Sequence, residues 1–207
     1  MRVGLLGGTF NPPHVAHLVC AQEALLQLEL ERVLLVPVAV PPHKAVEDDP
    51  GAAHRVAMCE AAVADDDRLG VSRVDVDRPG PSYTVDSLRA LRAAAPDDEL
   101  VFVVGGDMAH SLPNWREPEA ILALAELGVA EREEVRRADI VERLAPLDGA
   151  AERVRFFAMP RLDVSSSLLR QRAAAGLPLR YLVPDAVAAY VEREGLYRSR
   201  LSLEGTG

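Results

Sequence analysis

Aromatic residues, cysteines and long apolar runs are scarce in this chain of 207 residues. Aromatic residues make up 4% of the chain, and its two cysteines, Cys20 and Cys59, lie in stretches rich in alanine, leucine and valine. We expect two buried thiols, with neither a disulfide nor a structural zinc site. Proline or charge interrupts each apolar run well before the roughly 18 residues of a membrane span, and the N-terminus has no pattern of a secretory signal. The sequence therefore predicts a cytoplasmic protein without a membrane segment.

Positive charge is also in the minority, because 23 Lys and Arg face 32 Asp and Glu, for a net charge of −9. This balance argues against a nucleic-acid partner, since phosphate backbones require a basic surface. A hydrophobic share of 49% excludes a disordered chain. The sequence predicts one domain over residues 1–198, with a helical portion from about residue 165 and a disordered tail at 199–207.

Apolar strand patterns alternate with Ala- and Leu-rich helical patterns along the chain. Strands are predicted at residues 2–6, 32–37, 70–76, 100–104, 127–130 and 154–158, and helices at 15–28, 52–64, 84–95 and from 118. The charge-dense segment 131–149 has a weak helical stripe, so a solvated helix is expected there. The alternation predicts an α/β fold, a Rossmann-like doubly wound parallel sheet with a small C-terminal helical part.

The densest chemical signal is the segment 7–17, which links the first strand to the first helix. Gly7 and Gly8 allow close approach of the backbone to a ligand, and the helix start favours an anion. The segment is neither a GxGxxG turn nor a GxxxxGK[ST] loop. His14 and His17 are three residues apart and share one side of the first helical turn. For such a pair taken alone, a purely structural role as partly exposed imidazoles has about the same weight as a functional role. A zinc site lacks a third and a fourth ligand, so phosphate is the favoured partner.

Segment 7–17 resembles the GGTFxPxHxGH signature of the adenylyltransferases related to class I aminoacyl-tRNA synthetases. Five further blocks follow in the same order as in bacterial nicotinate-nucleotide adenylyltransferases, and together the six cover nearly the whole chain. The further blocks are Val36-Pro37 with Pro41-Pro42-His43-Lys44, Arg78 to Thr84, Gly105-Gly106-Asp107 with Trp115, Val164 to Ser167 with Arg170, and Val183-Pro184 through Tyr197. The sequence is therefore similar to this family over most of its length.

The resemblance implies an enzyme that transfers the adenylyl group of ATP, with Mg²⁺, to nicotinate mononucleotide, giving deamido-NAD and pyrophosphate. It implies a catalytic set of His14, His17, Lys44 and Arg170. The implied ATP contacts are Gly8, Thr9, Phe10, His14, His17, Gly106, Asp107, Ser165, Ser166 and Arg170. The implied mononucleotide contacts are Asn11, Lys44, Tyr83, Thr84 and Trp115, with no resident metal site.

Structural roles compete with several of these assignments. Lys44 could be an ordinary surface lysine, the serines from Ser165 a helix cap, and Asp107 a cap of the next helical turn. A lone tryptophan such as Trp115 more often packs than stacks on a ligand. The sequence alone leaves these alternatives open.

The match departs from the family pattern at three places. Ala16 replaces the glycine between the two histidines, and its methyl group is expected to crowd the adenine position. Ser167 stands where threonine is common, and residues 131–134 replace an Arg-Pro-Gly loop. Another acceptor, such as nicotinamide mononucleotide, phosphopantetheine or flavin mononucleotide, and a non-catalytic nucleotide-binding module remain alternatives. The oligomeric state is left open.

Overall fold

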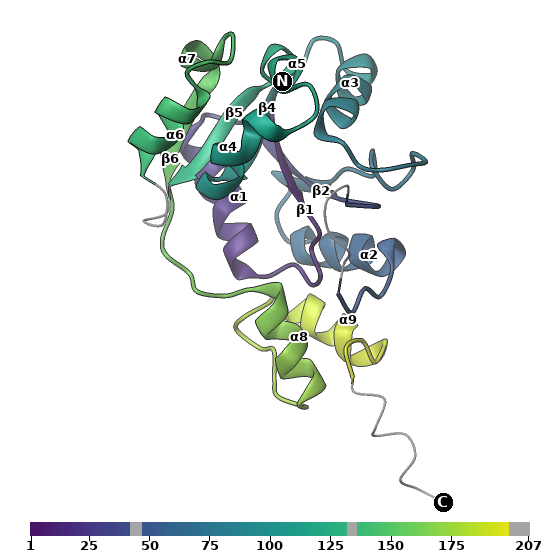
Figure 1. Ribbon diagram of the computed structural model, residues 1–207. Helices are drawn as coiled ribbons and strands as arrows, with labels where there is room; N and C mark the ends of the chain where they lie inside the picture. The colour runs from purple at the N-terminus through teal and green to yellow at the C-terminus, as the bar shows by residue number, and fades with distance from the viewer. Residues whose placement is uncertain (42–46, 132–135, 199–207) are drawn as a thin grey trace, which may run out of the picture.

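The computed structural model describes residues 1–41, 47–131 and 136–198. Within them, parallel strands form one sheet in the order β3-β2-β1-β4-β5-β6 (Figure 1). The strands are β1 Arg2–Gly8, β2 Arg32–Pro37, β3 Leu69–Val71, β4 Glu99–Gly105, β5 Glu126–Glu131 and β6 Val154–Ala158. Because the chain winds outward from β1 in one direction and from β4 in the other, a crevice opens between the carboxyl ends of these two strands.

Both faces of the sheet are covered by helices. Along β1, Leu5 packs into a core shared with α3, α5 and α6, whereas its neighbour Leu6 packs into a core shared with α1 and α2. The helices are α1 Val15–Gln27, α2 Ala52–Val63, α3 Thr84–Ala94, α4 Gly106–Ser111, a 3₁₀ turn η1 Leu112–Asn114, α5 Pro118–Leu124, α6 Arg137–Leu144, α7 Ala150–Arg153, α8 Ser166–Ala174 and α9 Asp185–Arg193. Successive side chains of a strand point to opposite faces, so this alternation gives the doubly wound fold predicted from the sequence.

Two predicted elements differ from the structure. The strand expected at 70–76 is only β3, Leu69–Val71, because the chain then turns, with the Asp77 amide donating to the Arg73 carbonyl at 2.9 Å. The solvated helix expected over 131–149 is the shorter α6, and it is not fully solvated. Ile140 and Leu144 are each 1% exposed and belong to the core, so its stripe is a packing face.

Helices α8 and α9 form the lower part of the molecule in Figure 1. They share a third core with α2, in which Met58, Leu169 and Val187 are fully buried. The Val15 amide at the start of α1 donates to the Leu182 carbonyl at 3.1 Å. This packing brings the start of α8 beside the loop that precedes α1. The domain limits of 1–198 stay a prediction, and the expected tail lies outside the described residues.

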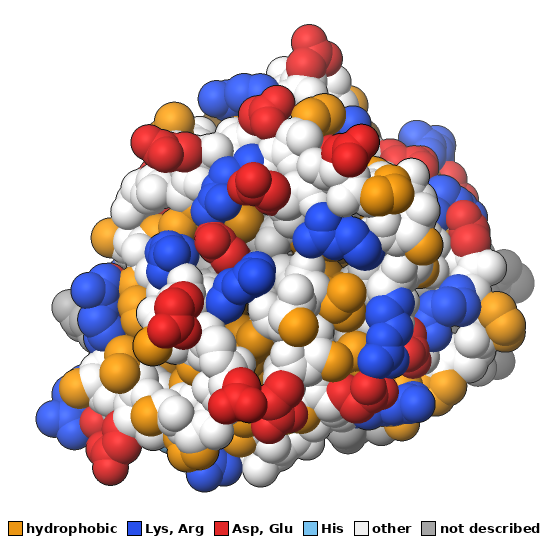
Figure 2. Space-filling model, turned by 90° about the horizontal axis from the view of Figure 1, so that it is seen from above, with side chains coloured by type: hydrophobic (Ala, Val, Ile, Leu, Met, Phe, Trp, Pro, Cys, Tyr) orange, Lys and Arg blue, Asp and Glu red, His pale blue; other side chains and the backbone are white. Residues whose placement is uncertain are grey.

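Acidic and basic side chains are interspersed on the face seen from above in Figure 2. Although the whole chain has a net charge of −9, its acidic side chains do not form a single patch on this face. Within the described part of the chain, no helix combines the length and apolar character needed to cross a membrane.

Candidate active site

The loop that follows β1, residues 9–14, folds back tightly before α1. Phe10 has a positive φ of 51°, and its ring is buried at 1% exposure. A Cβ on Gly8 would lie 3.0 Å from this ring, so a larger residue there would push the ring by a few tenths of an ångström. The Phe10 ring in turn meets the His17 ring edge to face, with centroids 4.9 Å apart. The glycine turn and the aromatic ring thus support the position of His17.

The two histidines lie together at the start of α1. His14 is the N-cap residue, and its ring stacks on that of His17 with centroids 3.8 Å apart. The backbone N–H of His14 donates to Nδ1 of His17 at 3.2 Å. Because Nδ1 accepts this bond, neutral His17 carries its proton on Nε2, where it can donate to an anion. The backbone therefore selects the tautomer of His17.

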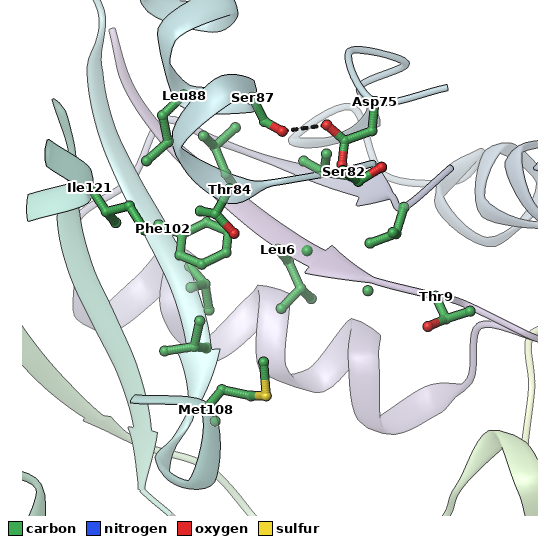
Figure 3. A pocket seen from close by; sticks show the side chains of 18 of the residues that line it. Leu6, Thr9, Asp75, Ser82, Thr84, Ser87, Leu88, Phe102, Met108 and Ile121 are labelled. Atoms are coloured by element: carbon green, nitrogen blue, oxygen red, sulfur yellow. Dashed lines mark hydrogen bonds between the residues drawn. The ribbon is translucent and has the colours of Figure 1, made fainter. Parts of the chain in front are cut away.

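A cavity of about 550 Å³ opens at the crevice between β1 and β4 (Figure 3). Seven of the residues expected to contact substrate line it: Gly8, Thr9, His17, Tyr83, Thr84, Asp107 and Trp115. Ala16 also lines it and is 2% exposed, and the crowding of adenine by its methyl group stays a prediction. Segments far apart in the sequence are thus brought to one cavity.

Tyr83, Thr84 and Trp115 line the part of the cavity at the start of α3, termed here the α3 end. Tyr83 is the N-cap residue of α3, and Thr84 begins the helix. The Trp115 indole N–H donates to Ser111 Oγ at 2.9 Å, which fixes the ring. The ring also meets Phe102 edge to face, with centroids 6.1 Å apart. Trp115 is therefore both packed and exposed to the cavity, so the two interpretations of a lone tryptophan are compatible.

A buried carboxylate at the same cavity was missed by sequence reasoning. Asp75 lines the cavity and is 4% exposed. It accepts a hydrogen bond from Ser87 Oγ, drawn in Figure 3, and lies 3.4 Å from Arg78 Nη2. These partners compensate its charge. The sequence signal that could have identified Asp75 is its position three residues before the block Arg78 to Thr84.

Gly106 and Asp107 begin α4 at the carboxyl end of β4. Gly106 is buried and Asp107 is exposed at the cavity. The N-cap position belongs to Gly105, and no side chain caps this helix. Asp107 is therefore not a helix cap, and it lines the cavity, where its contact with ATP stays a prediction.

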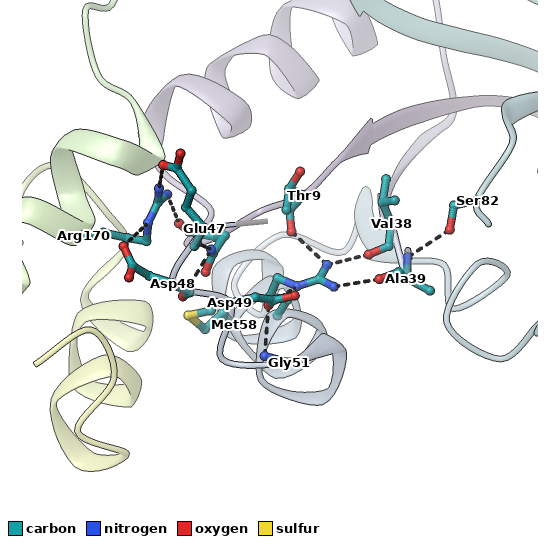
Figure 4. A network of polar contacts seen from close by, with 12 residues as sticks. Thr9, Val38, Ala39, Glu47, Asp48, Asp49, Gly51, Met58, Ser82 and Arg170 are labelled. Atoms are coloured by element: carbon teal, nitrogen blue, oxygen red, sulfur yellow. Dashed lines mark hydrogen bonds and ion pairs between the residues drawn. The ribbon is translucent and has the colours of Figure 1, made fainter. Parts of the chain in front are cut away.

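Arg55 of α2 is a second residue that sequence reasoning missed. Its side chain is 0% exposed, and Nη1 donates to the carbonyls of Thr9 at 3.1 Å and Val38 at 2.6 Å (Figure 4). Nη2 donates to the Ala39 carbonyl at 3.2 Å, and Nε pairs with Asp49 Oδ1 at 2.9 Å. Arg55 thus joins the segments that follow β1 and β2 to the segment before α2. The sequence signal that could have identified Arg55 is a single arginine in a helix rich in alanine and valine.

Arg170 of α8 approaches the same loop from the other side. It is 9% exposed, and its Nη1 donates to the Asn11 carbonyl at 3.1 Å. Nη2 lies 3.6 Å from Glu47 and Nε lies 3.6 Å from Asp48, two carboxylates that are each 73% exposed (Figure 4). Arg170 does not line the cavity, but it bonds to the 9–14 loop, whose residue Thr9 does. Both ion pairs are longer than a hydrogen bond and involve exposed carboxylates, so they hold the guanidinium only weakly.

The serines at the start of α8 have structural partners. Ser165 is the N-cap, and its Oγ accepts a bond from the Leu168 amide at 3.2 Å. Ser166 Oγ donates to the Pro12 carbonyl at 2.8 Å, which ties α8 to the loop before α1. The capping role weighed for this segment is therefore present at Ser165, and phosphate contacts from Ser165 and Ser166 stay a prediction.

The structure does not bring Asn11 to the cavity. Its side chain is 2% exposed, donates from Nδ2 to the Glu47 carbonyl at 2.9 Å, and accepts from the Tyr197 hydroxyl at 2.7 Å. Burial raises the pKa of Tyr197, so the hydroxyl stays protonated and can donate. The Asn11 side chain thus links its loop to Glu47 and Tyr197. The expected contact of this side chain with the mononucleotide is not supported. Lys44 lies outside the described residues.

A family pattern described as cytidylyltransferase-like matches residues 5–172, which assigns the chain to a class of nucleotidyltransferases. Curated relatives extend this match to almost the full chain. A probable nicotinate-nucleotide adenylyltransferase of Thermomicrobium roseum is 43% identical over 198 residues, covering 96% of this chain and 92% of the relative. One of Roseiflexus sp. is 42% identical over 196 residues, covering 95% and 98%. The chain belongs to the nicotinate-nucleotide adenylyltransferase family.

A solved structure supports the fold. The nicotinic acid mononucleotide adenylyltransferase of Plasmodium falciparum, complexed with NaAD, superposes with a TM-score of 0.76 at 16% identity, covering 95% of this chain and 97% of that one. This likeness confirms the α/β fold expected from the sequence, and the family pattern and the curated relatives confirm the expected family and enzyme class.

Proposed function

We propose that the chain transfers the adenylyl group of ATP to nicotinate mononucleotide by direct displacement. A phosphate oxygen of the mononucleotide forms a bond to the α-phosphorus as the bond to pyrophosphate breaks, so no covalent enzyme intermediate is needed. The products are deamido-NAD and pyrophosphate. The observation that carries the assignment is the His14–His17 pair, in which a backbone N–H leaves the proton of His17 on Nε2 beside the cavity.

The phosphate-binding groups are divided between two sides of the 9–14 loop. His17 and Thr9 border the cavity, while Arg170 lies behind the loop and reaches the Asn11 carbonyl. We assign His17 Nε2 to a non-bridging oxygen of the α-phosphate, where a donor stabilises charge that develops in the transition state. Arg170 would hold the departing pyrophosphate, with its fork of N–H donors matched to phosphate oxygens.

Magnesium enters as part of the ATP substrate in this proposal. Among the described residues, no three His, Cys, Asp or Glu side chains are grouped as a metal site. Mg²⁺ is commonly bound by substrate phosphates with only one or two protein carboxylates, and we assign it here to the triphosphate of ATP. It would neutralise charge on the phosphates when bound. The cytoplasmic location stays a prediction.

The proposal is tested by measuring pyrophosphate release from ATP and nicotinate mononucleotide, in the wild type and in His17→Ala. Loss of one transition-state donor is expected to lower kcat about 10² to 10³-fold. His110→Ala, which alters an exposed histidine of α4 that does not line the cavity, serves as the matched control and should keep the wild-type rate. An unaltered kcat in His17→Ala would refute the role of this residue.

The choice of acceptor is read from the same assay with other mononucleotides. Pyrophosphate release with nicotinate mononucleotide above that with nicotinamide or flavin mononucleotide supports the assignment. ATP binding by calorimetry without pyrophosphate release with any acceptor would instead support a non-catalytic nucleotide-binding module.

A further inference from the structure

Arg116 brings a positive charge to the α3 end of the cavity. It follows Trp115 directly and lines the cavity together with Tyr83 and Thr84. Its guanidinium carbon lies 4.8 Å from the centroid of the Tyr83 ring. A guanidinium over an aromatic face directs its N–H groups outward in its own plane, where they can bond to a ligand beside the ring.

The ion pairs of Arg116 hold it only weakly. Its closest distances to Asp86 and Glu117 are both 3.7 Å, longer than a hydrogen bond, and these carboxylates are 28% and 42% exposed. Its neighbour Arg89, by contrast, bonds to Glu117 at 2.6 Å. Of the two arginines, Arg89 is committed to a surface pair, and Arg116 can exchange its partners for a ligand at small cost.

The acid and amide forms of the pyridine mononucleotide differ in what they offer to such a group. A carboxylate has two acceptor oxygens and a negative charge, which match the guanidinium fork, whereas a carboxamide has one acceptor and an NH₂ donor. Asp75, a further charged residue among the described residues that line the cavity, is already paired with Ser87 and Arg78. An anionic ring substituent beside Arg116 would therefore meet a guanidinium whose own carboxylate partners, Asp86 and Glu117, are each 3.7 Å away.

We propose that the Arg116 side chain determines the preference of this enzyme for the nicotinate carboxylate over the nicotinamide carboxamide. The inference rests on the proposed function, because it places the pyridine ring at the α3 end beside Trp115. The guanidinium would bind the carboxylate in both the ground state and the transition state. Its loss should therefore raise the KM for the acid substrate more than it lowers kcat.

The test compares kcat/KM for nicotinate and nicotinamide mononucleotide in the wild type, Arg116→Gln and Arg89→Gln. In Arg116→Gln the value for the acid is expected to fall about tenfold while that for the amide stays within about twofold, as for loss of one charge-assisted bond. Arg89→Gln removes the same charge from the same cluster without changing the cavity lining, so its acid-to-amide ratio should equal that of the wild type. Arg116→Lys, which keeps the charge but loses the fork, should recover part of the ratio.

Three results would overturn the inference: an unchanged ratio in Arg116→Gln, an equal fall for both substrates, or the same loss of selectivity in Arg89→Gln. The equal fall would show that Arg116 shapes the loop rather than reading the substituent. Failure of the proposed function is a separate result, because the wild type would then release no pyrophosphate with either mononucleotide.

Discussion

Two buried arginines, Arg55 and Arg170, contact the loop between β1 and α1 from different sides, but they bind different kinds of partner. Arg55 donates to three backbone carbonyls and to a carboxylate at 2.9 Å, and its side chain is completely buried. Arg170 donates to one carbonyl and faces two exposed carboxylates at 3.6 Å. Backbone carbonyls cannot leave without unfolding the loop, whereas exposed carboxylates can return to water. Arg55 therefore stabilises the loop, and under the proposed function Arg170 exchanges its carboxylate partners for a ligand.

The largest expected effect is on stability, in Arg55→Ala. Removal of this side chain leaves the carbonyls of Thr9, Val38 and Ala39 and the Asp49 carboxylate without their common donor, which is expected to lower the free energy of unfolding by about 3–5 kcal/mol. Urea denaturation followed by circular dichroism measures the change. Arg170→Ala is the comparison variant and should lose only about 1–2 kcal/mol, since its two carboxylates can be hydrated. Equal losses would show that the two arginines have the same structural role.

A smaller effect is expected from neutralising the partners of Arg170. The double variant Glu47→Gln/Asp48→Asn removes two weak exposed ion pairs that compete with phosphate, so the KM for ATP should fall about two- to fivefold at low ionic strength. Steady-state kinetics with varied ATP measures this. Asp65→Asn/Asp67→Asn makes the same charge change at exposed residues after α2 and corrects for the general field. A KM that rises above that of this control would mean that Glu47 and Asp48 hold Arg170 in place for the ligand.

The smallest effect is expected at Ala16, which lines the cavity on the far side of the loop from Arg170. Ala16→Gly removes one buried methyl group, so the KM for ATP should fall slightly or stay unchanged. Glycine in the helix is also expected to lower the free energy of unfolding by up to about 1 kcal/mol. The assay is therefore run at a temperature below the unfolding transition of the variant. A clear rise in KM would show that the adenine site has been reshaped around alanine.

Part of the site expected from the sequence lies at one cavity because those motif residues follow strand ends, and the carboxyl ends of parallel strands meet at one edge. Thr9 and Asp107 follow β1 and β4 in this way, and both line the cavity. The same reasoning failed for Asn11, because nothing in a loop motif tells which of its side chains turn inward. Asn11 turns toward Tyr197, a residue 186 positions away in the chain. Arg55 was missed for the same reason, since its carbonyl partners come from two other segments.

The order of strands and helices, the glycine turn and the three-residue spacing of the histidines follow from the sequence by itself, because hydrophobic period, backbone freedom and helical pitch are local properties. Only the tertiary structure decided that Arg55 would stabilise the loop, that Arg170 would face displaceable carboxylates and that Arg116 would lie over Tyr83 at the cavity. These outcomes depend on which polar groups are brought within bonding distance by packing between distant segments, and burial then makes each such bond costly to lose.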